Sequence, residues 1–285
     1  MPKHCPSTFA FPLESEMWKI NHRRCGLFFG SAAAILQIAH PRIAQGVADH
    51  SNFANDSLGR LNRTLAATNR IAFGTAEEAA LVRKKIHSLH RGVKGKACPK
   101  MAGAPSYTAF EPDLLLWVLA TLIMAALQGY EMVYGTVPAQ RKEQFYREMR
   151  EFGTFFGLEE GYGPADFEGF SEYYDSMIHG DLLGSHPLCA ELAQAIVAPG
   201  DSRGAVILGK VIRFLPVETI PEPVRGRLGF QSTLSTRAAM KIVRTTSPFA
   251  FPCLPRKMQW FPEALERWER HHASEITRIP LSSGV

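Results

Sequence analysis

The sequence predicts an all-α fold in a single large globular domain. Three observations predict it: apolar residues recur at helical spacing, helix-starting residues stand ahead of several such segments, and there is little convincing strand pattern. The chain has 285 residues, of which 46% are apolar and 21% charged, a balance typical of a globular protein with a sizeable core. We expect residues 1–13 to be irregular and residues 14–285 to form the domain.

The first long helical pattern is interrupted by a proline. Residues 30–40 are small and apolar and contain strong helix formers. Pro41 follows them, and proline disfavours helical geometry in the residue before it. We therefore expect a new helix or a kink to begin at Pro41. Further along, Asp56 and Ser57 are residues that commonly cap a helix, so another helix is expected to start there.

A capping box predicts the start of the following helix. Thr75 and Glu78 have the required spacing of three residues, ahead of a helical pattern over 79–89. Gly92 and Gly95 then break the pattern. The helix is therefore expected to end close to residue 91.

The most apolar run of the chain covers residues 114–127. It is shorter than the roughly 20 apolar residues that a bilayer-spanning helix needs, so it predicts a buried core helix over about 111–134 and no stable membrane insertion. Residues 94–106 are rich in Gly, Lys and Pro and are expected to form a loop. Further helices are expected over 138–156, 165–177, 187–196, 205–214 and 262–276, with helix and loop mixed over 221–259.

Charge and cysteine content exclude several classes of protein. The net charge is +5, but the basic residues are spread out, which is not typical of a nucleic-acid-binding protein. The five cysteines are scattered, odd in number and without a Cys-x-x-Cys pair. This argues against a disulfide framework and a structural zinc site. The first sixteen residues lack the apolar stretch of a signal peptide, so we expect a cytoplasmic protein.

Common catalytic motifs are missing from the sequence. It has no phosphate-binding glycine loop, no Gly-x-Ser-x-Gly elbow and no His-Glu-x-x-His motif. Glu269 and His272 form a single Glu-x-x-His motif. A helical di-iron site needs two such motifs and two further carboxylates. The remaining candidates for chemistry are the histidines.

Four of the ten histidines fall within about fifty residues of each other: His40, His50, His87 and His90. His87 and His90 are three residues apart, so they can share one face of the predicted helix. Imidazole is a good iron ligand, and one proximal histidine often holds a haem iron. From the residues alone, however, an ordinary hydrogen-bonding role is the more common outcome for such histidines.

A series of short motifs runs through the first half of the chain. It consists of LQIAHP at 36–41, ADHSNF at 48–53, GRLNRT at 59–64, AFG at 72–74, HRGVKG at 90–95, YTA at 107–109 and LWVLATL at 116–122. Each motif is weak alone. In this order and at these distances the series resembles the family of the rubber oxygenases (latex clearing proteins) and mpaB-type oxygenases. The resemblance covers roughly residues 26–157 well and the remainder loosely.

The resemblance implies a haem b protein, with a haem pocket inside the helical domain and oxygenase chemistry on an apolar organic substrate and O₂. His90 would be the proximal iron ligand. Arg60, Arg63 and Thr64 would match basic and hydroxyl residues near the distal side of the haem. His40 and His50 would lie near the pocket.

Two positions depart from the family pattern. The rubber oxygenases have a lysine in place of Arg63, and arginine is bulkier and does not deprotonate, so an axial role for this position is in doubt. Leu119 stands where many members have histidine, in the pattern Trp-Val-His-Ala-Thr-Leu. The change removes a hydrogen-bonding group.

The sequence is therefore compatible with three functions. The first is a haem b-dependent oxygenase, with oxidative cleavage of a carbon–carbon double bond as the candidate reaction. The second, suggested by the two departures, is a haem-binding protein without oxygenase activity, such as a sensor, a carrier or a weak peroxidase. The third is a haem-free binding module for an apolar ligand.

Overall fold

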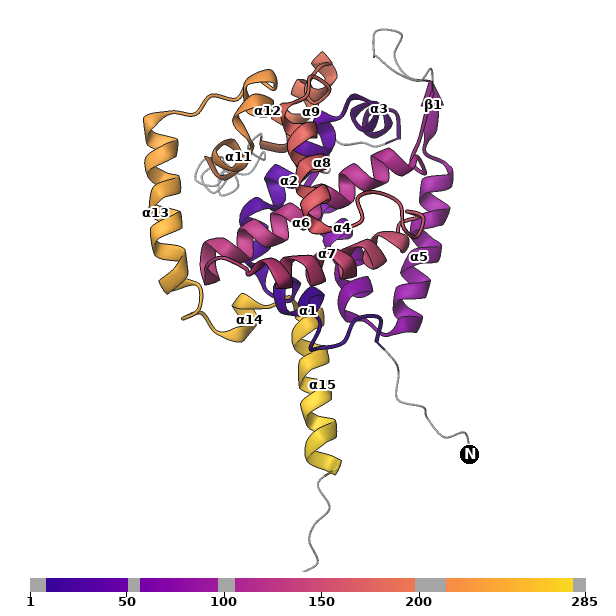
Figure 1. Cartoon of the computed structure of the whole chain (residues 1–285), viewed down its shortest axis with the longest axis vertical. Coiled ribbons are helices and arrows are strands. Elements are labelled where there is room, and N and C mark those ends of the chain that lie inside the picture. Colours follow the sequence, from indigo (N-terminus) through magenta and orange to yellow (C-terminus); the bar gives the residue numbers. More distant parts are fainter. Residues whose placement is uncertain (1–8, 51–56, 97–105, 198–213, 279–285) are drawn as a thin grey trace, which may run out of the picture.

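The structure, a computed structural model, describes residues 9–50, 57–96, 106–197 and 214–278. Over these ranges it is a helical domain with two three-residue strands, which confirms the all-α prediction (Figure 1). The helices are α1 (Glu16–Asn21), η1 (Arg24–Gly26), α2 (Leu27–Ala39), α3 (Pro41–His50), α4 (Ser57–Phe73), α5 (Ala76–Arg91), α6 (Pro112–Tyr134), α7 (Ala139–Thr154), α8 (Phe167–His179), α9 (Pro187–Val197), α11 (Phe214–Thr219), α12 (Glu222–Arg227), α13 (Leu234–Ala250), α14 (Arg256–Gln259) and α15 (Pro262–Arg278).

Helix α6 lies at the centre of the domain, with α5 towards one edge and α13 at the opposite edge (Figure 1). It packs along α2 and also contacts η1, α7 and α13. Within the described ranges it is the single helix long and apolar enough to cross a membrane unaided, and 67% of its apolar window is buried inside the protein. The prediction of a buried core helix is confirmed, and Pro112 occupies its first turn as expected.

The proline at position 41 starts a new helix, as predicted. Helices α2 and α3 meet at an angle of 96°. His40 stands at this corner with an extended backbone, ψ 119°. The chain therefore turns sharply just before it enters α3.

Helices α4 and α5 form a helical hairpin. The Thr75 side chain accepts a hydrogen bond from the backbone N–H of Glu78, and the Glu78 carboxylate accepts one from the N–H of Thr75, at 3.2 and 2.8 Å. The predicted capping box is therefore present. Helix α4 begins at Ser57 as expected, whereas Asp56 lies outside the described residues.

The expected loop over 94–106 is partly wrong, because both its ends are strands. β1 (Lys94–Lys96) pairs antiparallel with β2 (Ser106–Thr108), and Gly95 lies opposite Tyr107. A Cβ on Gly95 would come within 2.5 Å of the Tyr107 hydroxyl. Gly95 therefore permits the strand pairing and does not break the helix. The strands are too short for a period-two pattern to show in the sequence.

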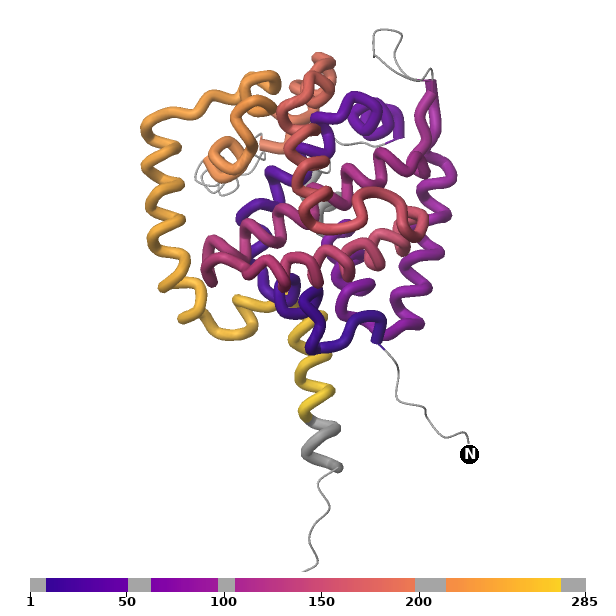
Figure 2. Tube along the Cα trace, viewed as in Figure 1, coloured from indigo at the N-terminus to yellow at the C-terminus, as the bar shows by residue number. Residues whose placement is uncertain are grey.

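The remaining helices form the second half of the domain. The predicted segments at 138–156, 165–177, 187–196 and 262–276 correspond to α7, α8, α9 and α15 within a few residues. The helix expected over 205–214 falls outside the described residues except for its last residue. Figure 2 shows that α15 leaves the body of the domain beneath α1.

Candidate functional site

Two histidines near the C-terminal end of α5 meet an aromatic side chain at the start of α6. The rings of His87 and His90 lie edge-on to the ring of Phe110, with centroid distances of 5.5 and 5.8 Å. The two histidines are three positions apart on the helix, so both project from the same side of α5. The sequence prediction that they share a face is confirmed.

Both imidazoles have an enclosed nitrogen atom without a hydrogen-bond partner. These atoms are Nε2 of His87 and Nδ1 of His90. Leaving a buried polar atom without a partner costs about 1–3 kcal/mol, and such atoms are rare in folded proteins unless they have a function or an unseen partner. The two unpartnered nitrogens therefore make His87 and His90 the candidate ligand-binding groups of this region.

The electrostatic environment favours the neutral form of His90. Burial lowers the pKa of His90 below its ordinary value, and the nearby His87 lowers it further. A neutral imidazole has a free nitrogen lone pair, which is the form that binds a metal. At neutral pH His90 is therefore ready to bind a metal without first losing a proton.

Gly157, in the connection between α7 and α8, closes one side of the pair. Its φ angle is +106°, in the region that favours glycine. A Cβ at this position would stand 3.1 Å from the Phe110 ring and 3.6 Å from Nε2 of His87. This role could not be predicted from the sequence, because both the backbone angle and the contact arise from the fold.

Arg60, Arg63 and Thr64 lie on α4, the partner of α5 in the hairpin. Ten residues separate Arg63 from the end of α4, and ten separate Ile86 from the start of α5, about 15 Å along each helix. Arg63 is therefore about as far from the turn of the hairpin as Ile86, which lies one position before His87 and four before His90. The side chains of Arg63 and Thr64 are exposed, and that of Arg60 lies outside the described part of the chain.

His40 and His50 have hydrogen-bonding roles away from this pair. Nδ1 of the buried His40 accepts a 3.3 Å hydrogen bond from the backbone N–H of Arg42. Burial, and secondly the charge of Arg42, lower the pKa of His40 to about 4. His50 is exposed, and its Nε2 lies 3.2 Å from the carbonyl oxygen of Lys94, which ties α3 to β1. Their expected place beside a haem remains a prediction.

Leu119, one of the two departures from the family pattern, is buried between α6 and α7. Its side chain reaches within 2.8 Å of the point where a Cβ on Gly153 would stand. The residue is 3% exposed and belongs to the main hydrophobic core. The position thus contributes packing where a histidine would contribute a polar group.

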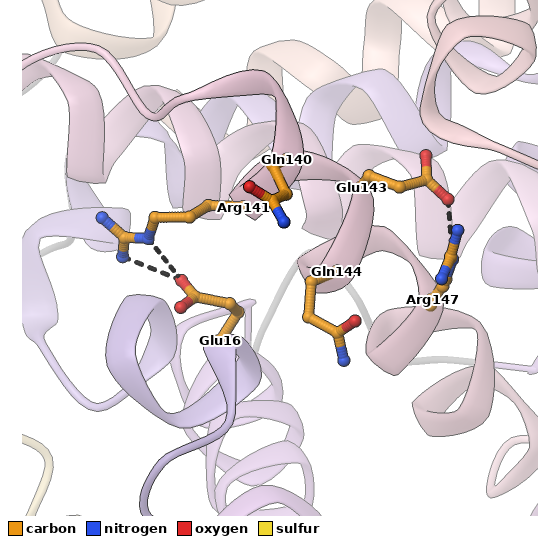
Figure 3. Close-up of a pocket in the computed structure, with 6 residues that line it drawn as sticks. All are labelled: Glu16, Gln140, Arg141, Glu143, Gln144 and Arg147. Carbon is orange, nitrogen blue, oxygen red and sulfur yellow. Dashed lines mark hydrogen bonds and ion pairs between the residues drawn. The ribbon is translucent and has the colours of Figure 1, made fainter.

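A polar recess between α1 and α7 is a poor candidate for catalysis. It is lined by Glu16, Gln140, Arg141, Glu143, Gln144 and Arg147 (Figure 3). Its charges are paired within the protein, since Arg141 contacts Glu16 and Arg147 contacts Glu143, each at 2.8 Å. We therefore interpret the recess as a junction between two helices that ion pairs stabilise.

Comparison with known proteins identifies the family. A family model for the catalytic domain of ER-bound oxygenase mpaB/B′ and rubber oxygenase matches residues 18–249. The chain belongs to this family. The match confirms the resemblance carried by the sequence motifs and extends it well into the C-terminal half, where the motifs indicated it only loosely.

Two curated mycobacterial proteins are similar to this chain. They are the uncharacterized protein Mb2261 of Mycobacterium bovis and the uncharacterized protein Rv2237 of Mycobacterium tuberculosis. Each is 29% identical over 154 residues, which is 53% of this chain and 59% of the relative. The chain thus spans about three-fifths of the length of these relatives. No solved structure matches the chain significantly.

Proposed function

We propose that this chain is a haem b-dependent oxygenase that acts on an apolar organic substrate with O₂, and that His90 is the iron ligand. The observation that carries the proposal is the half-buried imidazole of His90, whose enclosed Nδ1 has no hydrogen-bond partner and whose ring lies edge-on to Phe110. Family membership supports the oxygenase class. Oxidative cleavage of a carbon–carbon double bond is the candidate reaction, and it rests on the family alone.

The donor set fits a haem. A porphyrin provides four nitrogen ligands, so its iron needs only one imidazole from the protein. Among the described residues no group of three or more His, Cys, Asp or Glu side chains is placed to hold a metal ion together. A single half-buried imidazole is enough for this purpose, and His90 provides one.

The residues around the pair have separate roles in this proposal. Haem, when bound, supplies the iron at which O₂ is activated. His90 would hold that iron, and its burial, together with the nearby His87, lowers its pKa and so favours the unprotonated ring. Arg60 and Arg63 would bind the propionates through charge-assisted hydrogen bonds. Exposure of Arg63 suits a carboxylate at the outer edge of the cofactor. The Thr64 hydroxyl would donate a hydrogen bond on the distal side.

The proposal is tested by expressing the full chain with haem supplied and measuring haem content and O₂ uptake with squalene as an unsaturated apolar probe. We expect about one haem per chain and uptake that depends on squalene. Protein that stays colourless after haem titration would overturn the proposal and favour the haem-free binding module.

A pair of threonines on α4 makes the test more specific. Thr64→Val is expected to lower O₂ uptake and leave haem content unchanged. Thr68→Val is the matched control, because the Thr68 hydroxyl already donates to the carbonyl oxygen of Leu65 at 2.9 Å. Equal effects of the two substitutions would exclude a distal role for Thr64.

A second candidate is a haem protein without oxygenase activity, such as a sensor, a carrier or a weak peroxidase. The buried, apolar Leu119 favours it, because that position cannot relay a proton or donate a hydrogen bond. Haem-loaded protein that binds CO but consumes no O₂ with any unsaturated substrate would support this candidate over the first.

A further inference from the structure

Helix α13 stands at the edge of the domain (Figure 1), and several of its apolar side chains are exposed. It contacts α6 and α11, and Met240 and Ser247 are its buried residues. Leu234, Ile242 and Phe249 point outward, with exposures of 83%, 61% and 77%. Leu234 and Phe249 are the two most exposed large apolar side chains in the described part of the chain.

These apolar residues form a single stripe. Leu234, Ala238, Ile242 and Phe249 follow one another at intervals of four, four and seven residues, which keeps them on one face of a helix. The other side of α13 already packs on the domain. Apolar side chains that are this exposed on its outer side indicate a binding surface for a partner.

Basic side chains run along one side of the stripe. Arg237, Lys241 and Arg244 are exposed and follow helical spacing. From Gln231 to Phe261 the chain has five Lys and Arg residues and no Asp or Glu, so this stretch alone carries as much positive charge as the net +5 of the whole chain. Three of these five residues, Arg237, Lys241 and Arg244, lie on α13 beside the apolar stripe, and the other two lie on α14.

Carboxylates of neighbouring elements neutralise little of this charge. Glu218 of α11 lies near Arg237 and accepts a hydrogen bond from Thr236, at the N-terminal end of α13. Within the described residues Lys241 and Arg244 form no ion pair. The middle of the helix thus keeps its positive charge available for a partner.

We propose that α13 docks on an anionic lipid surface, lying along the membrane with Leu234, Ile242 and Phe249 in the acyl region and Arg237, Lys241 and Arg244 among the headgroups. A helix with an apolar stripe, a basic side and little overall hydrophobicity is typical of an interfacial membrane helix. The thinness of the stripe and its basic border therefore favour lipid over a protein partner.

The helix is already formed before docking. Thr233 accepts a hydrogen bond from the N–H of Thr236, and the Thr236 side chain accepts one from the N–H of Thr233, at 3.2 and 2.9 Å. A preformed helix loses little conformational entropy on binding. Docking of the whole domain therefore needs no refolding of α13, and it is independent of whether haem is bound.

The test is co-sedimentation of the full chain with vesicles of phosphatidylcholine alone, or containing one-third phosphatidylglycerol. We expect binding to the anionic vesicles, and at least about tenfold weaker binding for the double variant Ile242→Ser, Phe249→Ser. The double variant Lys241→Glu, Arg244→Glu is expected to lose anionic binding to at least the same extent. Raising the salt concentration should weaken it as well.

Matched controls lie on α5, which also has exposed apolar and basic residues. Leu81→Ser and the pair Arg83→Glu, Lys84→Glu change the same residue types on the opposite edge of the domain and should leave binding unchanged. Circular dichroism checks that each variant is folded. Because vesicle binding is measured without substrate or haem, failure here is separable from failure of the oxygenase proposal.

Four results would overturn the proposal. The first three are absence of binding to anionic vesicles by the unaltered chain, equal loss in the α5 controls, and binding that survives both α13 double variants. A fourth is a self-associated chain, seen by light scattering, that Phe249→Ser dissociates, because it would assign the stripe to a second copy of the protein.

Discussion

Gly157 leaves room for the side chains of Phe110 and His87, because it has no Cβ of its own. We predict that Gly157→Ala destabilises the fold by at least about 1 kcal/mol more than Gly161→Ala, in urea unfolding. Both glycines have positive φ, +106° and +81°, so both substitutions strain the backbone by about 1–2 kcal/mol. A Cβ at Gly161 would meet open space, whereas at Gly157 it would press on Phe110. Equal costs would contradict the contact described here.

Buried neutral histidines predict how stability depends on pH. Burial is the main cause that lowers the pKa of His22 and of His40 from 6.5 to about 4. Because the folded pKa is depressed, the unfolded chain takes up protons first as pH falls. The contribution of these two histidines to stability is therefore fully present above pH 6.5. It is lost as the pH falls from 6.5 to about 4, by on the order of 3 kcal/mol per histidine.

The variant His40→Asn tests this dependence. An asparagine oxygen can replace Nδ1 as the acceptor from Arg42 and does not protonate in this range. We expect a shallower loss of unfolding free energy from pH 7 to pH 4.5 than in the unaltered chain. His179→Asn changes an exposed histidine and should leave the slope as it is. An unchanged slope in His40→Asn would count against the burial of a neutral His40.

At the residue scale the sequence predicted part of the site. His87 and His90 could be placed together because helical spacing and a capping box fix their positions on α5. Phe110 and Gly157 could not be assigned to them, since these contacts join segments that only the tertiary fold brings together. Helix periodicity likewise could not predict that the side chains of Arg63 and Thr64 are exposed.

At the scale of elements, a glycine permits the close backbone approach between α6 and η1. A Cβ on Gly129 would come within 2.5 Å of the carbonyl oxygen of Cys25 and 2.6 Å of the Cα of Gly26. We predict that Gly129→Ala lowers the free energy of unfolding by about 2–3 kcal/mol, because two backbones must separate.

Gly26→Ala is the control for this contact. Its Cβ would lie 3.6 Å from the Cα of Ala126, an ordinary contact, and its φ is −57°. The expected change is within about 1 kcal/mol. Urea unfolding of both variants, side by side, measures the difference. If Gly26→Ala were the more harmful, the close approach would not lie where the structure has it.

The elements themselves were largely predictable where local chemistry is strong. Pro41, the capping box at Thr75 and the apolar run in α6 each fix a helix boundary or a helix type without help from the rest of the chain. The strands β1 and β2 were not predictable. They contain only three residues each, and the close packing of Gly95 on Tyr107 that they permit is a tertiary contact.

At the scale of the whole molecule, two different surfaces lie on opposite sides of the core helix α6. The histidine pair belongs to α5, and the apolar, basic stripe belongs to α13 (Figure 1). In the proposals made above, one holds the cofactor and the other holds the protein at a lipid surface. An apolar substrate would partition into that same lipid surface, so both proposals are compatible with one protein.

The most direct test of the central claim is the absorption spectrum of the haem-loaded chain and of His90→Gly. We predict a Soret band in the unaltered chain, its loss or a clear shift in His90→Gly, and its return when free imidazole is added, because imidazole can replace the missing ligand. His87→Gly should keep the original spectrum. An unchanged spectrum in His90→Gly, or loss in His87→Gly alone, would contradict the assignment of His90 as the iron ligand.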